Sequence, residues 1–169
     1  GSENVYKRQP YKLDFNSTAN NSIAGVIQSS ARPIRLLDQW NNPTSQSSAV
    51  SVLVQVVSSS DTAQVNRTVG TYTIASGAIS TNITLADTAV TRSGTYQFKL
   101  SATGLQDGFS NTFTITNAQA DKLVVVQNVG ATVRSGVSIS PVVRLEVQDQ
   151  FGNPVLNSTT SVSVSPASG

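Results

Sequence analysis

Few side chains in this chain of 169 residues could do chemistry. It contains nine carboxylates and neither histidine nor cysteine. The absence of histidine and cysteine from the sequence excludes Ser-His-Asp and Cys-His catalysis, and also zinc held by cysteine or histidine. No two carboxylates are expected to form a close pair on one strand face, as a glycosidase needs, and no glycine-rich phosphate loop occurs. The sequence therefore predicts that the chain is not an enzyme and binds no cofactor or metal.

Two of these carboxylates belong to a segment that occurs twice. Residues 38–43 read DQWNNP, and residues 149–154 read DQFGNP. The Gly-Val pair at 25–26 returns at 136–137, at the same offset of 111 residues. A repeat of this length corresponds to one whole small domain, so the pattern predicts tandem domains.

The repeated segment is expected to be a turn. Asp38 and Asp149 can accept backbone N–H bonds across it, and Gly152 permits a positive φ. The alternative is a calcium site at Asp38 with Asn41 or Asn42. Calcium takes six to eight oxygens, usually from several carboxylates, whereas only one carboxylate lies near each turn. A metal-free structural turn is therefore the favoured interpretation.

Alternation of apolar and polar residues with a period of two predicts strands along nearly the whole chain. Turn residues separate these runs at roughly 8–12-residue spacing, and no window of ten or more residues shows a helical period. The prediction is an all-β chain with an immunoglobulin-like β-sandwich, in which residues 49–57 form a central strand. The seven strand candidates of the first repeat are residues 11–15, 33–38, 49–57, 71–75, 82–85, 96–102 and 111–116. Its predicted core includes Tyr96, Phe98, Leu100, Phe113 and Ile115.

Three regions follow from this organisation. Residues 1–10 are a lead-in, and their Gly-Ser start resembles the remnant of a tag. Residues 11–120 form the first repeat, and residues 121–169 are the N-terminal part of a second repeat. The short linker at 117–120 predicts a semi-rigid array.

The second repeat is expected to be incomplete. It offers strands at 122–127, 142–148 and 160–164, with no later strands to cover an apolar face formed by Val124, Val126, Leu145 and Val147. Open strand edges and an uncovered face predict one of two outcomes. Residues 121–169 are poorly ordered, or they pair with strands of another copy.

Composition sets the expected environment. Charged residues make up only 12% of the chain, against roughly 25% in an average soluble protein, and Ser, Thr, Asn and Gln carry the surface instead. The net charge is +2, and the basic cluster of Lys7, Arg8 and Lys12 is interpreted as a solvated strand end rather than a nucleic-acid patch. No apolar run reaches the roughly 18 residues of a membrane span. An extracellular or cell-surface location is expected, without nucleic acid or membrane insertion.

Three stretches carry a family resemblance. Residues 141–154 (PVVRLEVQDQFGNP) form a strand ending in Asp, followed by an aromatic residue, Gly, Asn and Pro. The second stretch is residues 93–98 (SGTYQF). The third combines residues 113–115 (FTI) with residues 121–124 (DKLV), at the junction between one repeat and the next. Together they resemble bacterial immunoglobulin-like surface repeats, the invasin/intimin-like adhesin stalk domains and related tandem repeats. Filamin-type repeats are similar, and the first repeat departs by having Trp-Asn where Phe-Gly is more usual.

The resemblance implies a structural spacer in a cell-surface adhesin, with neighbouring repeats as its partners and no catalytic residues. The alternative is an immunoglobulin-like recognition module for a glycan or another protein. It would use Trp40, Tyr72 or the loops at 58–66 and 106–110. Trp40 is more often a residue that covers one end of a sandwich than a ligand platform. Tyr96, two residues after a glycine, is expected to form a tyrosine corner, in which the phenol bonds upstream backbone.

Overall fold

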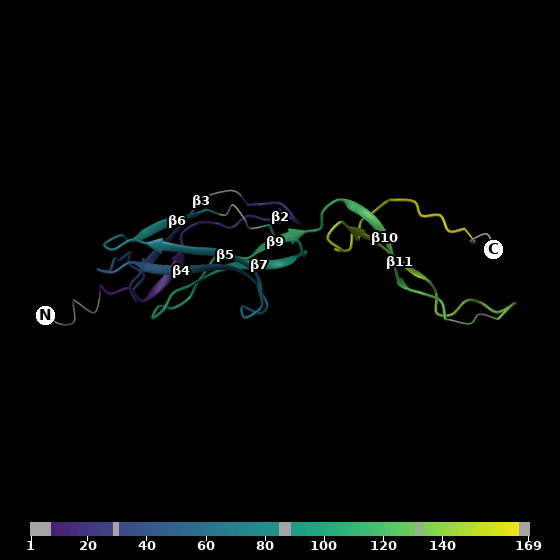
Figure 1. Ribbon diagram of the computed structural model, residues 1–169, viewed down its shortest axis with the longest axis horizontal. Coiled ribbons are helices and arrows are strands. Elements are labelled where there is room, and N and C mark those ends of the chain that lie inside the picture. The colour runs from purple at the N-terminus through teal and green to yellow at the C-terminus, as the bar shows by residue number, and fades with distance from the viewer. Residues whose placement is uncertain (1–7, 29–30, 85–88, 131, 133, 166–169) are drawn as a thin grey trace. The chain divides into compact units, whose positions relative to one another are not determined.

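The described part of the chain is built from strands and turns. The computed structural model describes residues 8–28, 31–84, 89–130, 132 and 134–165, and these contain no helix. The predicted all-β class is therefore confirmed. The chain divides into two compact units, Gly1–Thr116 (unit 1) and Asn117–Gly169 (unit 2) (Figure 1). Within the described residues, no helix could serve as a membrane span.

Unit 1 contains two sheets. The three-stranded sheet has the order β1 (Lys12–Phe15), β3 (Ala31–Leu37) and β6 (Ser80–Thr84). The six-stranded sheet has the order β2 (Ser22–Ile23), β9 (Phe113–Thr116), β7 (Gly94–Ser101), β4 (Val50–Ser58) and β5 (Val65–Ile74), with β8 (Gly108–Phe109) also paired to β7. Neighbouring strands are antiparallel except β2 and β9, which are parallel.

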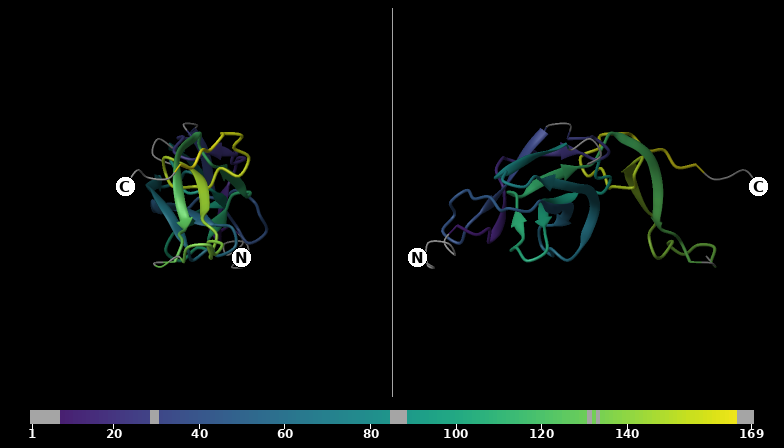
Figure 2. Two further views of the ribbon diagram at one scale, coloured as in Figure 1. Left: turned by 90° about the vertical axis from the view of Figure 1, so that its right-hand side faces the viewer. Right: turned by 60° about the vertical axis from the view of Figure 1, so that its left-hand side comes forward.

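A core of aromatic and branched residues joins the two sheets. Phe15 of β1 stacks on Phe98 of β7 with ring centroids 5.3 Å apart, and Phe98 stacks on Phe113 of β9 at 5.1 Å. Because side chains alternate across a strand, strands of both sheets bury one set of side chains, such as Ile34 and Leu36 of β3 and Phe98 and Leu100 of β7. Figure 2 shows the strands of unit 1 in two further views. All five predicted core residues are buried, as expected: Tyr96, Phe98, Leu100, Phe113 and Ile115.

The predicted strands of unit 1 lie close to the observed ones. β4 lies between β5 and β7, so its predicted central position is confirmed. β5 begins earlier than predicted, at Val65, because residues 65–70 lack clean alternation while their backbone pairs with β4. The two-residue strands β2 and β8 were not predicted, since two residues display no period.

β1 connects the two sheets through its backbone. It pairs with β3 in the three-stranded sheet. On the other side, the N–H of Leu13 donates to the carbonyl of Gln106 at 3.1 Å, and the N–H of Gln106 donates to the carbonyl of Tyr11 at 2.9 Å. Nearby, a Cβ on Gly108 would lie 2.4 Å from the Leu13 carbonyl oxygen. The glycine is required by this close approach of two backbones.

Unit 2 contains a two-stranded antiparallel ribbon. It consists of β10 (Ala120–Gln127) and β11 (Arg144–Asp149). The strand predicted at 160–164 is wrong, because these residues form no ladder. Val162 and Val164 within them are 45% and 85% exposed. Strand-like alternation alone does not make a strand when no neighbouring strand offers its hydrogen bonds.

The register of the ribbon differs from that of its counterpart in unit 1. In unit 1, Leu13 pairs with Leu36 across β1 and β3. At the offset of 111 residues, the same pairing would place residue 124 opposite residue 147. Instead, Leu123 lies opposite Val147. The pairing of β10 therefore differs by one residue from the pairing of β1 at that sequence offset.

This difference changes which side chains share a face. Val125 pairs with Leu145 and Leu123 with Val147, so these four residues form one apolar face, here called the ribbon face. The expectation that Val124 and Val126 share this face is wrong, because Val124 lies opposite Glu146 and a register shift follows Val125. Residues 123–126 are all apolar, so either register places apolar side chains on each face of the strand. The register is weakly specified where no face is buried.

Candidate functional site

The turn after β3 is organised around the Asp38 carboxylate. Its Oδ1 accepts the N–H groups of Trp40 and Asn42, both at 2.9 Å, and its Oδ2 accepts the side-chain amide of Asn42 at 3.1 Å. The backbone closes the turn, with the Asp38 N–H donating to the Asn42 carbonyl at 2.9 Å. Asn41 adopts a φ of 70°, in the left-handed region that asparagine tolerates. The predicted acceptor role of Asp38 is confirmed.

The turn after β11 repeats this arrangement bond for bond. Asp149 Oδ1 accepts the N–H groups of Phe151 at 2.9 Å and Asn153 at 2.8 Å, and Oδ2 accepts the Asn153 side-chain amide at 2.8 Å. Gly152, with a φ of 87°, stands where Asn41 stands in the first turn. Asp149 makes one further contact, because the N–H of Ala118 donates to its Oδ2 at 2.8 Å.

These contacts keep both carboxyls ionised. Burial alone would raise the pKa of Asp38, but the N–H groups of Asn42 and Trp40 outweigh it and hold that pKa below its usual value. At Asp149 burial is likewise outweighed by the donors of Asn153, Ala118 and Phe151, and the pKa falls to about 2. Such carboxyls cannot act as general acids near neutral pH.

The calcium alternative gains no support from these contacts. Both oxygens of Asp38 and of Asp149 accept N–H donors, so each carboxylate is already engaged by its own turn. In the described part of the chain, no three acidic, histidine or cysteine side chains gather where they could hold a metal.

The two predicted ligand contacts lie in different settings. Trp40 lies on the Asp38 turn with 48% of its surface exposed, so the turn covers only about half of it. Tyr72 lies on β5 opposite Val52 of β4, and its hydroxyl donates to the Thr84 carbonyl of β6 at 2.6 Å. Because β5 and β6 belong to different sheets, Tyr72 links the two sheets at one edge.

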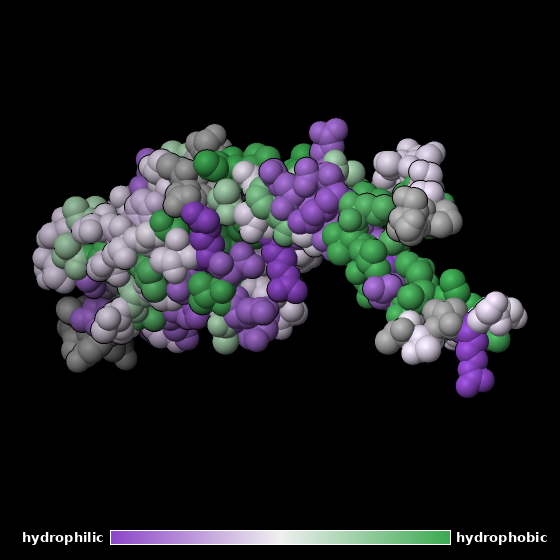
Figure 3. Space-filling view, turned by 45° about the vertical axis from the view of Figure 1, so that its right-hand side comes forward, coloured by the Kyte–Doolittle hydropathy of each residue, from purple (hydrophilic) through white to green (hydrophobic). Residues whose placement is uncertain are grey.

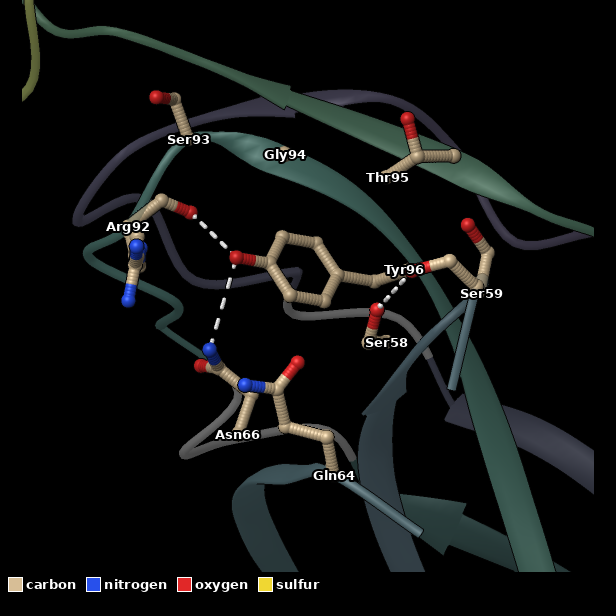
Figure 4. Close-up of a pocket in the computed structure, with 10 residues that line it drawn as sticks. Ser58, Ser59, Gln64, Asn66, Arg92, Ser93, Gly94, Thr95 and Tyr96 are labelled. Carbon is tan, nitrogen blue, oxygen red and sulfur yellow. Dashed lines mark hydrogen bonds between the residues drawn. The ribbon is translucent and has the colours of Figure 1, made fainter. Parts of the chain in front are cut away.

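A polar hollow of about 390 Å³ lies where the β4–β5 loop meets the start of β7 (Figure 4). Beside it, the Tyr96 hydroxyl donates to the Arg92 carbonyl at 2.9 Å, which confirms the predicted tyrosine corner. The side chain of Asn66 also reaches this hydroxyl, at 3.5 Å. Burial raises the pKa of Tyr96 in spite of the positive charge of Arg92. The hollow is lined by Ser58, Ser59, Ser60, Gln64, Asn66, Arg92, Ser93, Gly94, Thr95 and Tyr96.

This hollow offers a small polar molecule hydrogen-bonding groups and the positive charge of Arg92. The hydroxyls of Ser58 and Ser60 lie 3.0 Å apart, and the N–H of Ser59 donates to the Thr95 carbonyl at 3.0 Å. The candidate loop at 58–66 supplies one wall, as sequence reasoning allowed, but Arg92 was missed. The signal lay in the tyrosine corner, which brings the residues before Tyr96 beside the end of β4.

The other candidate loop, 106–110, is used by the fold itself. Gln106 bonds to β1, and the Ser110 hydroxyl accepts the N–H of Phe98 at 2.9 Å. That hydroxyl also donates to the carbonyl of Asn111 at 2.7 Å. The backbone of this loop and its Ser110 therefore extend the six-stranded sheet, while Gln106 and Asp107 stay exposed.

Asn111 is a structural residue that sequence reasoning missed. Its side chain accepts the N–H of Ala19 at 2.7 Å and donates to the Ala19 carbonyl at 3.0 Å. One amide side chain thus replaces a pair of strand hydrogen bonds. No sequence signal marks this role, because Asn111 lies in an ordinary polar turn.

The chain matches no protein-family model, and a search of curated proteins finds no match. The functional argument therefore rests on the residues and their geometry.

Proposed function

We propose that the chain is a structural spacer of an extracellular surface or adhesin-type protein, built from tandem immunoglobulin-like repeats. In this proposal unit 1 is one complete β-sandwich repeat, and unit 2 is the beginning of the next. The observation that carries the proposal is the Asp turn, which has the same five hydrogen bonds at Asp38 and at Asp149. Three of them go to the carboxylate, and two join backbone groups within the turn.

Further correspondences at the same offset support the repeat. Gly25 and Gly136 have φ values of 80° and 78°. Each turn is followed by a bridge back to its own strand, through Pro43 in unit 1 and Pro154 in unit 2. Two segments with the same special backbone angles and the same bonds are expected of two copies of one domain.

The remaining features agree with a spacer role and with a partner that is simply the next repeat. The chain has no histidine or cysteine, and the Asp carboxyls that recur are occupied by their turns. The proposal therefore assigns the chain no catalytic function, no cofactor and no metal.

Pulling on the chain by its ends tests this proposal. A spacer domain unfolds under force as one cooperative unit, because its sheets share a core. Unit 1 should give a single step with a contour-length gain of about 350–390 Å. A gradual extension without such a step would contradict the proposal.

A second candidate function is a recognition module for a glycan. It is favoured by the half-exposed indole of Trp40 and by the polar hollow beside Arg92. A glycan array probed with the chain and with its Trp40→Ala and Arg92→Gln variants tests it. Binding that one variant removes would support recognition, and absence of binding by the parent chain would leave the spacer role.

A further inference from the structure

We propose that Asp149 fixes the linker to unit 2, so that the connection between the two units flexes only at Asn117. The contact that does this is the hydrogen bond from the N–H of Ala118 to Asp149 Oδ2, here called the linker bond. The inference deepens the proposed spacer function and rests on it, since a spacer keeps its length only where its linkers are stiff.

Unit 1 holds the chain up to Thr116. This residue ends β9 and pairs with Ile23 of β2, and its carbonyl accepts the N–H of Ala24 at 2.8 Å. The backbone of Thr116 is therefore part of the six-stranded sheet, and its dihedrals are those of a strand.

Unit 2 holds the chain again from Ala118. The linker bond measures 2.8 Å, and β10 begins two residues later, opposite Asp149 itself. Only Asn117 lies between Thr116 and Ala118, and one residue supplies two soft backbone dihedrals. Without the linker bond the free segment would extend over residues 117–119 and supply about six.

The Asp149 carboxylate can hold its turn and the linker together. In the Asp38 turn, three donor groups of the turn itself engage the carboxylate. The same three come from Phe151 and Asn153 at Asp149, and the N–H of Ala118 is a fourth. A carboxylate oxygen has two lone pairs, so Oδ2 accepts from both Asn153 and Ala118. Bonds to an ionised acceptor are stronger than those between neutral groups.

Side-chain packing contributes little to holding the start of unit 2. Figure 3 shows hydrophobic side chains along the surface of unit 2, and Leu123 and Val125 of β10 are 48% and 54% exposed. In the described part of unit 2, the buried residues are Asp149 and Asn153. The linker bond therefore attaches the chain to the part of this unit that is shielded from water.

Two substitutions at the turn test the proposal by amide exchange of the full chain. Asp149→Asn leaves one acceptor oxygen, which can serve the turn or the linker but not both. Exchange of the Ala118 amide should then quicken by about tenfold to a hundredfold, the order expected when a hydrogen bond to a charged group is lost. Asn153→Ala is the matched control, because it removes an amide donor from the same Oδ2 and keeps the linker bond. Its Ala118 amide should exchange at the rate of the parent chain.

Nitrogen relaxation of the same samples measures the consequence for the linker. In the parent chain and in Asn153→Ala, mobility between the two units should be confined to Asn117. In Asp149→Asn it should spread to Gln119, and the tumbling times of the two units should move apart.

Several outcomes overturn the proposal. One is an Ala118 amide that exchanges equally fast in the parent chain and in Asp149→Asn. Another is equal loosening of the linker by both variants, which would assign the effect to the turn as a whole.

The parent chain decides the question alone if Asp149→Asn also frees the amide of Phe151 and so disrupts the turn. The Ala118 amide shift should follow the titration of Asp149 at about pH 2, and an invariant shift contradicts the linker bond. The unfolding step of unit 1 under force does not depend on this bond. Failure of the inference is therefore distinguishable from failure of the spacer role.

Discussion

The two Asp turns are alike, but the strands that lead into them are not. The Asp38 turn follows a strand in which Ile34 and Leu36 are fully buried. The Asp149 turn follows a strand in which Leu145 is 38% exposed. The same turn is therefore built with and without a covered strand beside it. The turn is a local structure, whereas burial and register depend on a second layer.

The register of the two strand pairs shows what that second layer contributes. In unit 1 a one-residue slip would turn Leu13 and Phe15 away from Phe98, so burial fixes the pairing. In unit 2 the run 123–126 is apolar in both phases, and no such penalty applies. The difference teaches that the hydrophobic pattern selects a register only where a second layer covers the strand pair.

The largest expected effect contrasts a covered core with an open face. Phe98→Ala should lower the free energy of unfolding of unit 1 by about 3–5 kcal/mol, because Phe98 is fully buried between two rings. Val125→Ala in unit 2 should change stability by less than about 0.5 kcal/mol in dilute solution. Urea denaturation followed by residue-resolved amide signals measures both. Equal losses would remove the contrast between the units.

A smaller effect is expected where two backbones touch. Gly108→Ala should destabilise unit 1 by about 1–3 kcal/mol, because its Cβ would lie 2.4 Å from the Leu13 carbonyl oxygen. Gly130→Ala in unit 2 is the matched control, since the nearest atom to its Cβ would be 3.8 Å away. The midpoints of urea denaturation of the two variants, each compared with that of the parent chain, measure the difference. A neutral Gly108→Ala would mean that β1 does not hold the sheets as closely as described.

The tyrosine corner should contribute less. Tyr96→Phe removes the hydroxyl that donates to Arg92 and keeps the buried ring, so unit 1 should lose about 1 kcal/mol. Tyr11→Phe is the control, because it removes an exposed hydrogen bond, in which the Tyr11 hydroxyl accepts from Gln106 at 2.8 Å. Amide exchange should quicken around residues 92–96 and stay unchanged in unit 2. Faster exchange in unit 2 would argue against a local role.

A pH-dependent effect should be shared by both turns. Because the pKa values of Asp38 and Asp149 are lowered on folding from a usual 3.8, the ionised carboxyls stabilise the turns above about pH 4. This contribution is lost as the pH falls through the folded pKa, about 2 for Asp149.

Amide chemical shifts of Trp40 and Phe151 between pH 5 and pH 1.5 measure this titration. Both should move with carboxyl titration below the usual pKa, and Asp38→Asn or Asp149→Asn should abolish the movement in its own turn only. A midpoint near 3.8 would contradict the hydrogen bonds described for the turns.

Much of the fold of unit 1 could be predicted from residue alternation. The stripe from Tyr96 to Leu100 placed β7 in the core, and the alternation of Phe113 and Ile115 placed β9 there as well. The acceptor role of Asp38 and the tyrosine corner at Tyr96 were also predicted, since both are local motifs with fixed spacing. The role of Asn111, the bonding of Tyr72 to Thr84 and the position of Arg92 were not, because each joins segments far apart in the sequence.

The sequence by itself determined the all-β class, the repeated Asp turn and the alternation of the core strands of unit 1, because these depend on residues within a few positions of one another. The tertiary structure alone decided which strands exist and how they register. Residues 160–164 alternate like a strand but have no partner, and Leu123 rather than Val124 faces Val147. A strand is completed by its neighbours and a register by the layer that buries it, and neither is encoded in the segment itself.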